Sequence, residues 1–289
     1  MNDPPAEVPR AVNLRCLIQD VAPTEIQIIQ EIIALTLFDF GALAISTDGR
    51  IISAGFIDEP TARAAADELS RLNPSPSSIE ILAADDSWIA QQRETLGATR
   101  VGPWCLRPPW VDPPEDISPL HDIIIDPGGA FGHGGHPTTM AALALMVRNL
   151  GRGQRVLDIG TGTGVLAIVA ARLGAKVEAI DTSTDAIANA QANAERNQIP
   201  AESIRFIVGD ATDAKVELDD IVVANVTIDI HREIADTLRT SNKIIVSGLL
   251  GRQFRQLRSL YHSHRATTIR SIGAWVGVEL TRSNEAADR

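Results

Sequence analysis

Residues 156–164, VLDIGTGTG, run from apolar positions through an acid into alternating glycines. Gly160, Gly162 and Gly164 fall where a predicted strand turns into a predicted helix. A backbone without side chains can bend sharply there and approach a ligand at the helix N-terminus. Asp158 precedes the first glycine by two residues, and Asp181 follows it by 21. A carboxylate at the second distance is typical of folds that bind the ribose of a cofactor.

Two classes of cofactor fit this loop. Gly162, Gly164 and Ala167 match the G-x-G-x-x-A pattern of nicotinamide dinucleotide folds. Asp158 favours S-adenosylmethionine instead, because an acid would repel a pyrophosphate but attract an ammonium and a sulfonium. Asp210, in the stretch VGDAT, is placed to accept a hydrogen bond from an adenine amino group. The pattern therefore predicts a class I methyltransferase that uses S-adenosylmethionine.

The elements that must position these residues alternate between strands and helices from about residue 117 onward, which is typical of a parallel α/β sheet. Strands are predicted over 155–160, 176–181, 204–210, 220–226 and 243–249. Helices are predicted over 164–175, 184–197, 229–238 and 252–262. Residues 266–282 are expected to form two strands about Gly273. Residues 117–289 are thus predicted to be a Rossmann-like domain, a doubly wound sheet that ends in an antiparallel hairpin.

The N-terminal part has a different pattern. Strands are predicted over 11–18, 41–47, 50–56 and 79–82, with helices over 23–38 and from about 58 to 72. The order β-α-β-β-α-β is that of a ferredoxin-like α+β domain, with two helices on one face of an antiparallel sheet. We assign this domain to residues 1–82, and the proline-rich stretch 83–116 to a linker.

Composition excludes several classes of protein. The 289 residues carry a formal net charge of −11 without a basic cluster, which argues against direct binding to long nucleic acid and allows a basic partner. No apolar run is long enough for a membrane span, and the polar start MNDPPAEVPR does not resemble a secretory signal. A cytoplasmic protein is expected, with Cys16 and Cys105 as reduced thiols.

The histidines indicate no metal site. His133 and His136 are three residues apart, but glycines surround them and no third ligand is evident nearby. His262 and His264, beside Tyr261 near a predicted helix end, are expected to be solvated.

These motifs resemble those of the bacterial ribosomal protein L11 methyltransferases (PrmA type). The resemblance rests on DPGGAFGHGGHPTT at 126–139, VLDIGTGTGVLAI at 156–168, VVANV at 222–226, VSGLL at 246–250 and AWVGVEL at 274–280. It extends over nearly the whole chain. The N-terminal domain matches the family's substrate-recognition domain in size and order of elements.

The resemblance implies roles for further residues. The loop with Phe131 and Gly132, together with His136 and Thr138, would lie over the methionine part of the cofactor. Asn225 would face the transferred methyl group as the catalytic asparagine. The family trimethylates amino groups of the ribosomal protein, and a lysine with a solution pKa of about 10.4 must lose a proton before it can attack. An amide can hold the amine without adding a competing charge.

Several alternatives stay open. Asp181 and Asp210 could be helix caps, and Asn225 a turn residue. The chain departs from the family at His133 and Gly135, where threonines are usual, and in VTIDI, which lacks the family's proline after the asparagine. These departures bear on the substrate more than on the cofactor. The same fold could therefore act on another protein or a small-molecule amine, or could bind cofactor without catalysis.

Overall fold

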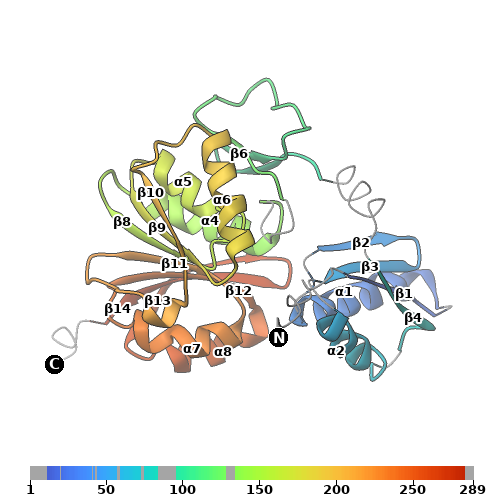
Figure 1. Ribbon diagram of the computed structural model, residues 1–289. Coiled ribbons are helices and arrows are strands. Elements are labelled where there is room, and N and C mark those ends of the chain that lie inside the picture. The colour runs from blue at the N-terminus through green and yellow to red at the C-terminus, as the bar shows by residue number, and fades with distance from the viewer. Residues whose placement is uncertain are drawn as a thin grey trace, which may run out of the picture. The chain divides into compact units, whose positions relative to one another are not determined.

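A computed structural model describes residues 12–19, 21–40, 42, 44–56, 59–72, 75–83, 96–127 and 134–283. The chain divides into two compact units, Met1–Thr95 and Leu96–Arg289 (Figure 1). Among the described residues, no helix has the length and apolar character needed to cross a membrane.

The first unit is a four-stranded antiparallel sheet in the order β2-β3-β1-β4. Its strands are β1 (Val12–Leu17), β2 (Ala44–Asp48), β3 (Ile51–Phe56) and β4 (Ser78–Ala83). Its helices are α1 (Pro23–Asp39) and α2 (Glu59–Leu69). Burial alternates along β1, with Val12, Leu14 and Cys16 inside, because successive side chains of a strand point to opposite faces. The predicted order of elements and strand directions is confirmed.

The second unit is built on a seven-stranded sheet in the order β10-β9-β8-β11-β12-β14-β13. Its strands are β8 (Arg155–Ile159), β9 (Lys176–Asp181), β10 (Ile204–Val208), β11 (Ile221–Asn225), β12 (Lys243–Leu250), β13 (His264–Ile272) and β14 (Trp275–Arg282). The first five strands in this spatial order are parallel, and β14 and β13 continue the sheet as an antiparallel hairpin. The predicted doubly wound sheet with a C-terminal hairpin is confirmed.

Helices cover both faces of this sheet (Figure 1). They are α4 (Pro137–Asn149), α5 (Val165–Arg172), α6 (Thr184–Arg196), α7 (Ile228–Leu238) and α8 (Phe254–Leu260), with short 3-10 turns at Ala211–Asp213 and Gly251–Gln253. The side chains of α4 and α5 belong to one buried apolar cluster, and those of α7 and α8 to another. The polar side chains of the candidate site lie at the carboxyl ends of the parallel strands.

A small sheet in the order β5-β6-β7 precedes α4 in the chain. It consists of β5 (Thr99–Val101), β6 (Trp104–Arg107) and β7 (Asp122–Ile124). The buried Arg107 guanidinium donates to both carboxylate oxygens of Asp122 at 2.8 Å, which ties β6 to β7. Part of the stretch predicted as a linker thus has regular structure within the second unit, whereas the division of the whole chain into domains stays a prediction.

The histidine at the start of β13 corrects one expectation. His264 is buried, and its Nε2 lies 2.8 Å from the carbonyl oxygen of Ser241. The ring also packs edge-on against the buried Tyr261. Of the two histidines expected to be solvated, His262 is exposed and His264 is not. The chain turns from α8 into β13 between these histidines, so that one of them points into the core.

Candidate active site

The loop between β8 and α5 holds its three glycines in the left-handed region. The φ angles are +66° at Gly160, +53° at Gly162 and +80° at Gly164. A Cβ at Gly160 would lie 2.6 Å from Cγ1 of Val226, and one at Gly164 would lie 2.9 Å from Cβ of Ala190. Both the backbone conformation and the available space therefore exclude side chains. The predicted sharp turn from strand to helix is present, with Gly164 at the N-cap of α5.

Asp158 supports this loop from the end of β8. Its Oδ2 accepts hydrogen bonds from the Thr161 hydroxyl at 2.7 Å and from the Ala167 amide at 3.1 Å, and the residue is almost wholly buried. Burial raises the pKa of this carboxyl to about 6; the two hydrogen bonds oppose that rise, and the nearby charge of Asp181 adds to it. Asp158 therefore holds the loop to the first turn of α5, whereas the predicted effect of its charge on a ligand stays a prediction.

Two further carboxylates lie at the ends of the next two strands. Asp181 is the last residue of β9, and Asp210 follows the end of β10 by two residues. Asp181 accepts from the Gly162 amide through Oδ2 and from the Ser183 amide through Oδ1, both at 3.0 Å. The exposed Asp210 accepts from the amide and the hydroxyl of Thr212 at 2.8 Å, which lowers the pKa of its carboxyl. Asp210 is the N-cap of the 3-10 turn Ala211–Asp213, as the alternative interpretation expected, whereas the N-cap of α6 is Ser183 and Asp181 ties the glycine loop to the end of β9. Their predicted contacts with ribose and adenine remain predictions.

Asn225 ends β11, the neighbour of β8 on the other side. Its Nδ2 donates to the hydroxyl of Thr139 on α4 at 3.3 Å, which orients the amide. Its Oδ1 is buried, and within the part of the chain that the structure describes it has no hydrogen-bond partner. An unpaired buried acceptor costs free energy. A ligand that donates a hydrogen bond at this point would remove that cost.

His136 and Thr138 form the start of α4. His136 is the N-cap, and its Nδ1 lies 2.7 Å from the Thr138 hydroxyl and accepts from the Thr138 amide. The His136 ring packs edge-on against Trp275 of β14, with 5.0 Å between ring centroids. The Thr138 carbonyl accepts from the hydroxyl of Ser247 on β12 at 2.8 Å. The remaining loop residues singled out in the sequence lie outside the described residues: Phe131, Gly132 and His133.

A buried histidine lies beneath this arrangement. His231 of α7 has its Nε2 3.3 Å from the Ser247 carbonyl and its Nδ1 3.1 Å from the Tyr261 hydroxyl. Ser247 pairs with Asn225 in the register of the parallel strands β12 and β11. Burial lowers the pKa of His231 to about 4, although its contact with the Ser247 carbonyl opposes this. The neutral imidazole thus supports the strand beside Asn225.

These two buried groups predict opposite pH dependences of the free energy of unfolding. The pKa of His231 is lower when folded than unfolded, so its stabilising contribution is present above pH 6.5 and is lost as the pH falls toward 4. The pKa of Asp158 is higher when folded, so its contribution is present below pH 3.8 and is lost as the pH rises through 6.

We expect urea unfolding from pH 4 to 7 to separate the two effects. As the pH rises, the stability of the wild type relative to His231→Gln should increase by about 3 kcal/mol, whereas its stability relative to Asp158→Asn should decrease by about 3 kcal/mol. Parallel curves for the wild type and either variant would contradict the titration assigned to that residue.

The structure brings the sequence-predicted groups to one edge of the sheet. The glycine loop, Asp181, Asp210 and Asn225 lie at or just after the carboxyl ends of β8, β9, β10 and β11. The chain order of the strands reverses between β8 and β11, which is where ligands bind in open α/β sheets. This sheet and loop define a class I methyltransferase that depends on S-adenosylmethionine. A family model described as ribosomal protein L11 methyltransferase (PrmA) matches residues 48–283, and the chain belongs to this family.

Individual relatives agree with this assignment. The chain is 34% identical over 234 residues to the ribosomal protein L11 methyltransferase of Cupriavidus pinatubonensis, which covers 78% of this chain and 76% of that protein. It is also 34% identical over 228 residues to that of Cupriavidus taiwanensis, covering 76% and 73%. A crystal structure of a ribosomal protein L11 methylase from Lactobacillus delbrueckii subsp. bulgaricus matches with a TM-score of 0.60 and 28% identity, covering 65% of this chain and all of that one.

Sequence reasoning missed several polar residues around this edge. His231 occupies a buried position among the apolar residues of α7, and a polar residue in an apolar register could have been noticed. Asn189, Asn193 and Asn197 recur every fourth residue in the stretch predicted as a helix over 184–197. That spacing places three amides on one helix face. Ser247 offered no comparable signal, because its partners come from distant segments.

Proposed function

We propose that this chain transfers methyl groups from S-adenosylmethionine to amino groups of ribosomal protein L11. Membership of the family supports the reaction and the substrate. The formal net charge of −11 is suited to a basic substrate. One observation in the site carries the proposal. The Oδ1 of Asn225, at the carboxyl edge of the sheet, is buried and has no hydrogen-bond partner among the described residues.

The residues at this edge fit the cofactor. The glycine loop has no room for a Cβ at Gly160 or Gly164, and its amides precede the N-terminus of α5, which suits a carboxylate. Asp181 retains acceptor capacity for ribose hydroxyls, since an ionised carboxylate offers about four lone-pair sites. Asp210 would accept from the adenine amino group, and the half-exposed Val208 lies two residues before it. His136 and Thr138, with Phe131 and Gly132, would complete the methionine side.

Asn225 would act on the amine. Its Oδ1 accepts one N–H of the neutral substrate amine, while the bond to Thr139 keeps the amide from rotating. The nitrogen lone pair is then directed at the methyl group. Holding the two reacting groups close together in this orientation speeds the transfer. When bound, the cofactor would supply a methyl group activated by the positive charge on its sulfur; transfer to the neutral amine would leave that sulfur uncharged, and the methylated nitrogen would release its extra proton to solvent. Because the amide of Asn225 carries no charge, it does not stabilise the ammonium form of the substrate, so the ammonium can lose a proton before the amine attacks.

Methyl labelling tests the substrate. The purified protein is incubated with methyl-labelled S-adenosylmethionine and ribosomal proteins from a strain that lacks the enzyme, and peptide mass spectrometry locates the label. We expect label on lysines or the N-terminus of L11. Label confined to another protein or to a small amine would overturn the proposed substrate and favour a retargeted methyltransferase, as the departures at His133 and Gly135 would allow.

Replacing Asp181 by alanine tests the cofactor site. We expect the Kd for S-adenosylhomocysteine to rise by about 10- to 100-fold, because ribose hydroxyls lose a charged acceptor and the Gly162 amide loses its partner. Asp185→Ala is the matched control, since it removes an exposed carboxylate from the first turn of α6. Equal Kd values for the two variants by calorimetry would remove Asp181 from the binding site.

A further inference from the structure

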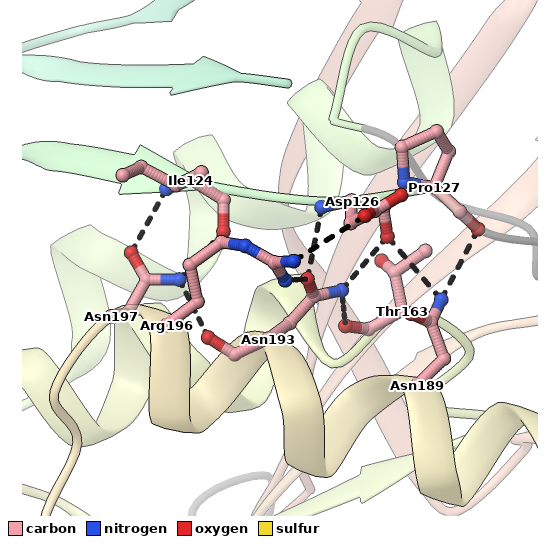
Figure 2. A network of polar contacts seen from close by, with 8 residues as sticks. All are labelled: Ile124, Asp126, Pro127, Thr163, Asn189, Asn193, Arg196 and Asn197. Carbon is pink, nitrogen blue, oxygen red and sulfur yellow. Dashed lines mark hydrogen bonds and ion pairs between the residues drawn. The ribbon is translucent and has the colours of Figure 1, made fainter. Parts of the chain in front are cut away.

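Helix α6 presents three asparagine side chains to a segment that lies far from it in sequence. Asn189, Asn193 and the C-cap Asn197 are spaced by four residues, so they line one face of the helix. Figure 2 shows their amides directed at Ile124–Pro127, the described stretch that precedes the GGAFGHGGHPTT motif in the chain. The helix thereby supplies side-chain amides where a neighbouring strand would supply backbone amides.

Asn197 and Asn189 hold the two ends of that stretch. Asn197 accepts from the Ile124 amide at 2.9 Å and donates to the Ile124 carbonyl at 2.6 Å. It also donates to the Asn193 carbonyl on its own helix at 2.8 Å. Asn189 donates to the carbonyls of Asp126 and Pro127 at 3.3 and 3.1 Å. None of these bonds reaches the glycine loop.

Asn193 is the asparagine of the three that contacts the glycine loop. Its Oδ1 accepts from the Asp126 amide at 2.9 Å and from the Arg196 guanidinium at 3.1 Å. Its Nδ2 donates to the Asp126 carbonyl at 3.0 Å and to the carbonyl of Thr163, in the glycine loop, also at 3.0 Å. Asn193 is fully buried. A side-chain amide has two hydrogens and two main acceptor sites, and all four are used here.

Only a primary amide of this length satisfies all four contacts. Aspartate has the same shape but no hydrogen to donate when ionised, so its oxygen would face two carbonyl oxygens. Alanine would remove the hydrogen bonds from Asn193 to the Asp126 amide and to the Thr163 carbonyl, and each hydrogen bond lost between buried groups costs free energy. The bond from Arg196 to Asp126, at 3.4 Å, closes the network on its outer side.

We propose that Asn193 is a positioning residue for cofactor binding: it fixes the stretch before the GGAFGHGGHPTT motif to the glycine loop. The inference rests on the proposed function, because it takes the glycine loop as one wall of the cofactor site. Thr163 lies between Gly162 and Gly164, so that a shift of its carbonyl moves both glycines. Asn193 therefore sets the distance between the stretch at Asp126 and the glycine loop at Thr163, because its one side chain binds both.

The experiment compares Asn193→Asp with Asn197→Asp. Each change places a carboxylate oxygen against two backbone carbonyls, but only the first involves the glycine loop. We expect both variants to lower the Tm. Calorimetry on the folded proteins should show the Kd for S-adenosylhomocysteine raised more than tenfold by Asn193→Asp and less than threefold by Asn197→Asp. In turnover, the KM for S-adenosylmethionine should rise in Asn193→Asp, with kcat at saturating cofactor largely retained.

Equal changes of Kd in the two variants, or an unchanged Kd in Asn193→Asp, would overturn the inference. If Asn193→Asp does not fold, Asn193→Ala and Asn197→Ala give the same comparison without an added charge. Failure of the wild type to bind S-adenosylhomocysteine would instead contradict the proposed function. A purely structural role for Asn193 would lower the Tm and leave the Kd of the folded protein unchanged.

Discussion

Replacing Asn225 by alanine is expected to lower kcat for methyl transfer by about 100-fold or more, while the Kd for S-adenosylhomocysteine stays nearly unchanged. The Oδ1 of Asn225 is a buried acceptor that has no hydrogen-bond partner among the described residues. In the proposed mechanism the amine would then lose the contact that aims its lone pair, and a misplaced reactant costs about 10²-fold in rate. In the proposed site the cofactor would be held mainly by the loop after β8 and by the acids at the end of β9 and after β10, which this change leaves intact.

Asn225→Asp separates positioning from charge. The carboxylate can still accept from the amine, but its charge stabilises the ammonium form and raises the pKa of the amine. We therefore expect the pH profile of kcat/KM to move to higher pH in Asn225→Asp, with partial recovery of rate at alkaline pH. Rates are measured with L11 at saturating cofactor. Wild-type kcat in Asn225→Ala would remove this residue from the mechanism.

Replacing Gly248 by alanine is expected to destabilise the fold by about 3 kcal/mol or more, a size reserved for severe local conflicts. Gly248 has a φ of +84°, and a Cβ there would lie 2.2 Å from the carbonyl oxygen of Val226. It sits where the register of β12 against β14 shifts, between Val246 and Leu249. Such an irregularity beside a site re-aims the strand. The conflict is with backbone, so a side-chain rotation cannot relieve it.

Gly273→Ala is the matched control for this prediction. Gly273 also has a positive φ, +58°, but no atom lies within 4 Å of its hypothetical Cβ. Its replacement should cost only the left-handed strain of about 1–2 kcal/mol. Chemical denaturation of both variants gives the comparison, and Gly248→Ala should also lose kcat because Val226 follows Asn225. Equal losses of stability would mean that the close approach at Gly248 carries no extra cost.

The sequence by itself determined the order of most elements and singled out most of the candidate site residues. Periodicity identified most strands and helices of both units, and the glycines with Asp158, Asp181 and Asp210 marked the ends of three strands. These inferences succeed because turn conformation and amphipathic spacing are local properties, which neighbouring residues decide. The same locality explains the failures at β5–β7 and α4. Those segments are short, proline-bordered or placed in a glycine-rich motif, and their regular structure depends on partners elsewhere.

Only the tertiary structure decided what each polar group contacts. It shows Asp158 buried under the loop, His264 in the core and His231 behind Ser247. It also joins Asn225 to Thr139, 86 residues away in sequence, and Asn193 to Thr163. Such hydrogen bonds depend on strand order and on which helix faces pack together. The physical reason is that burial and partner geometry arise from the whole arrangement, whereas the sequence specifies only which donors and acceptors are available to it.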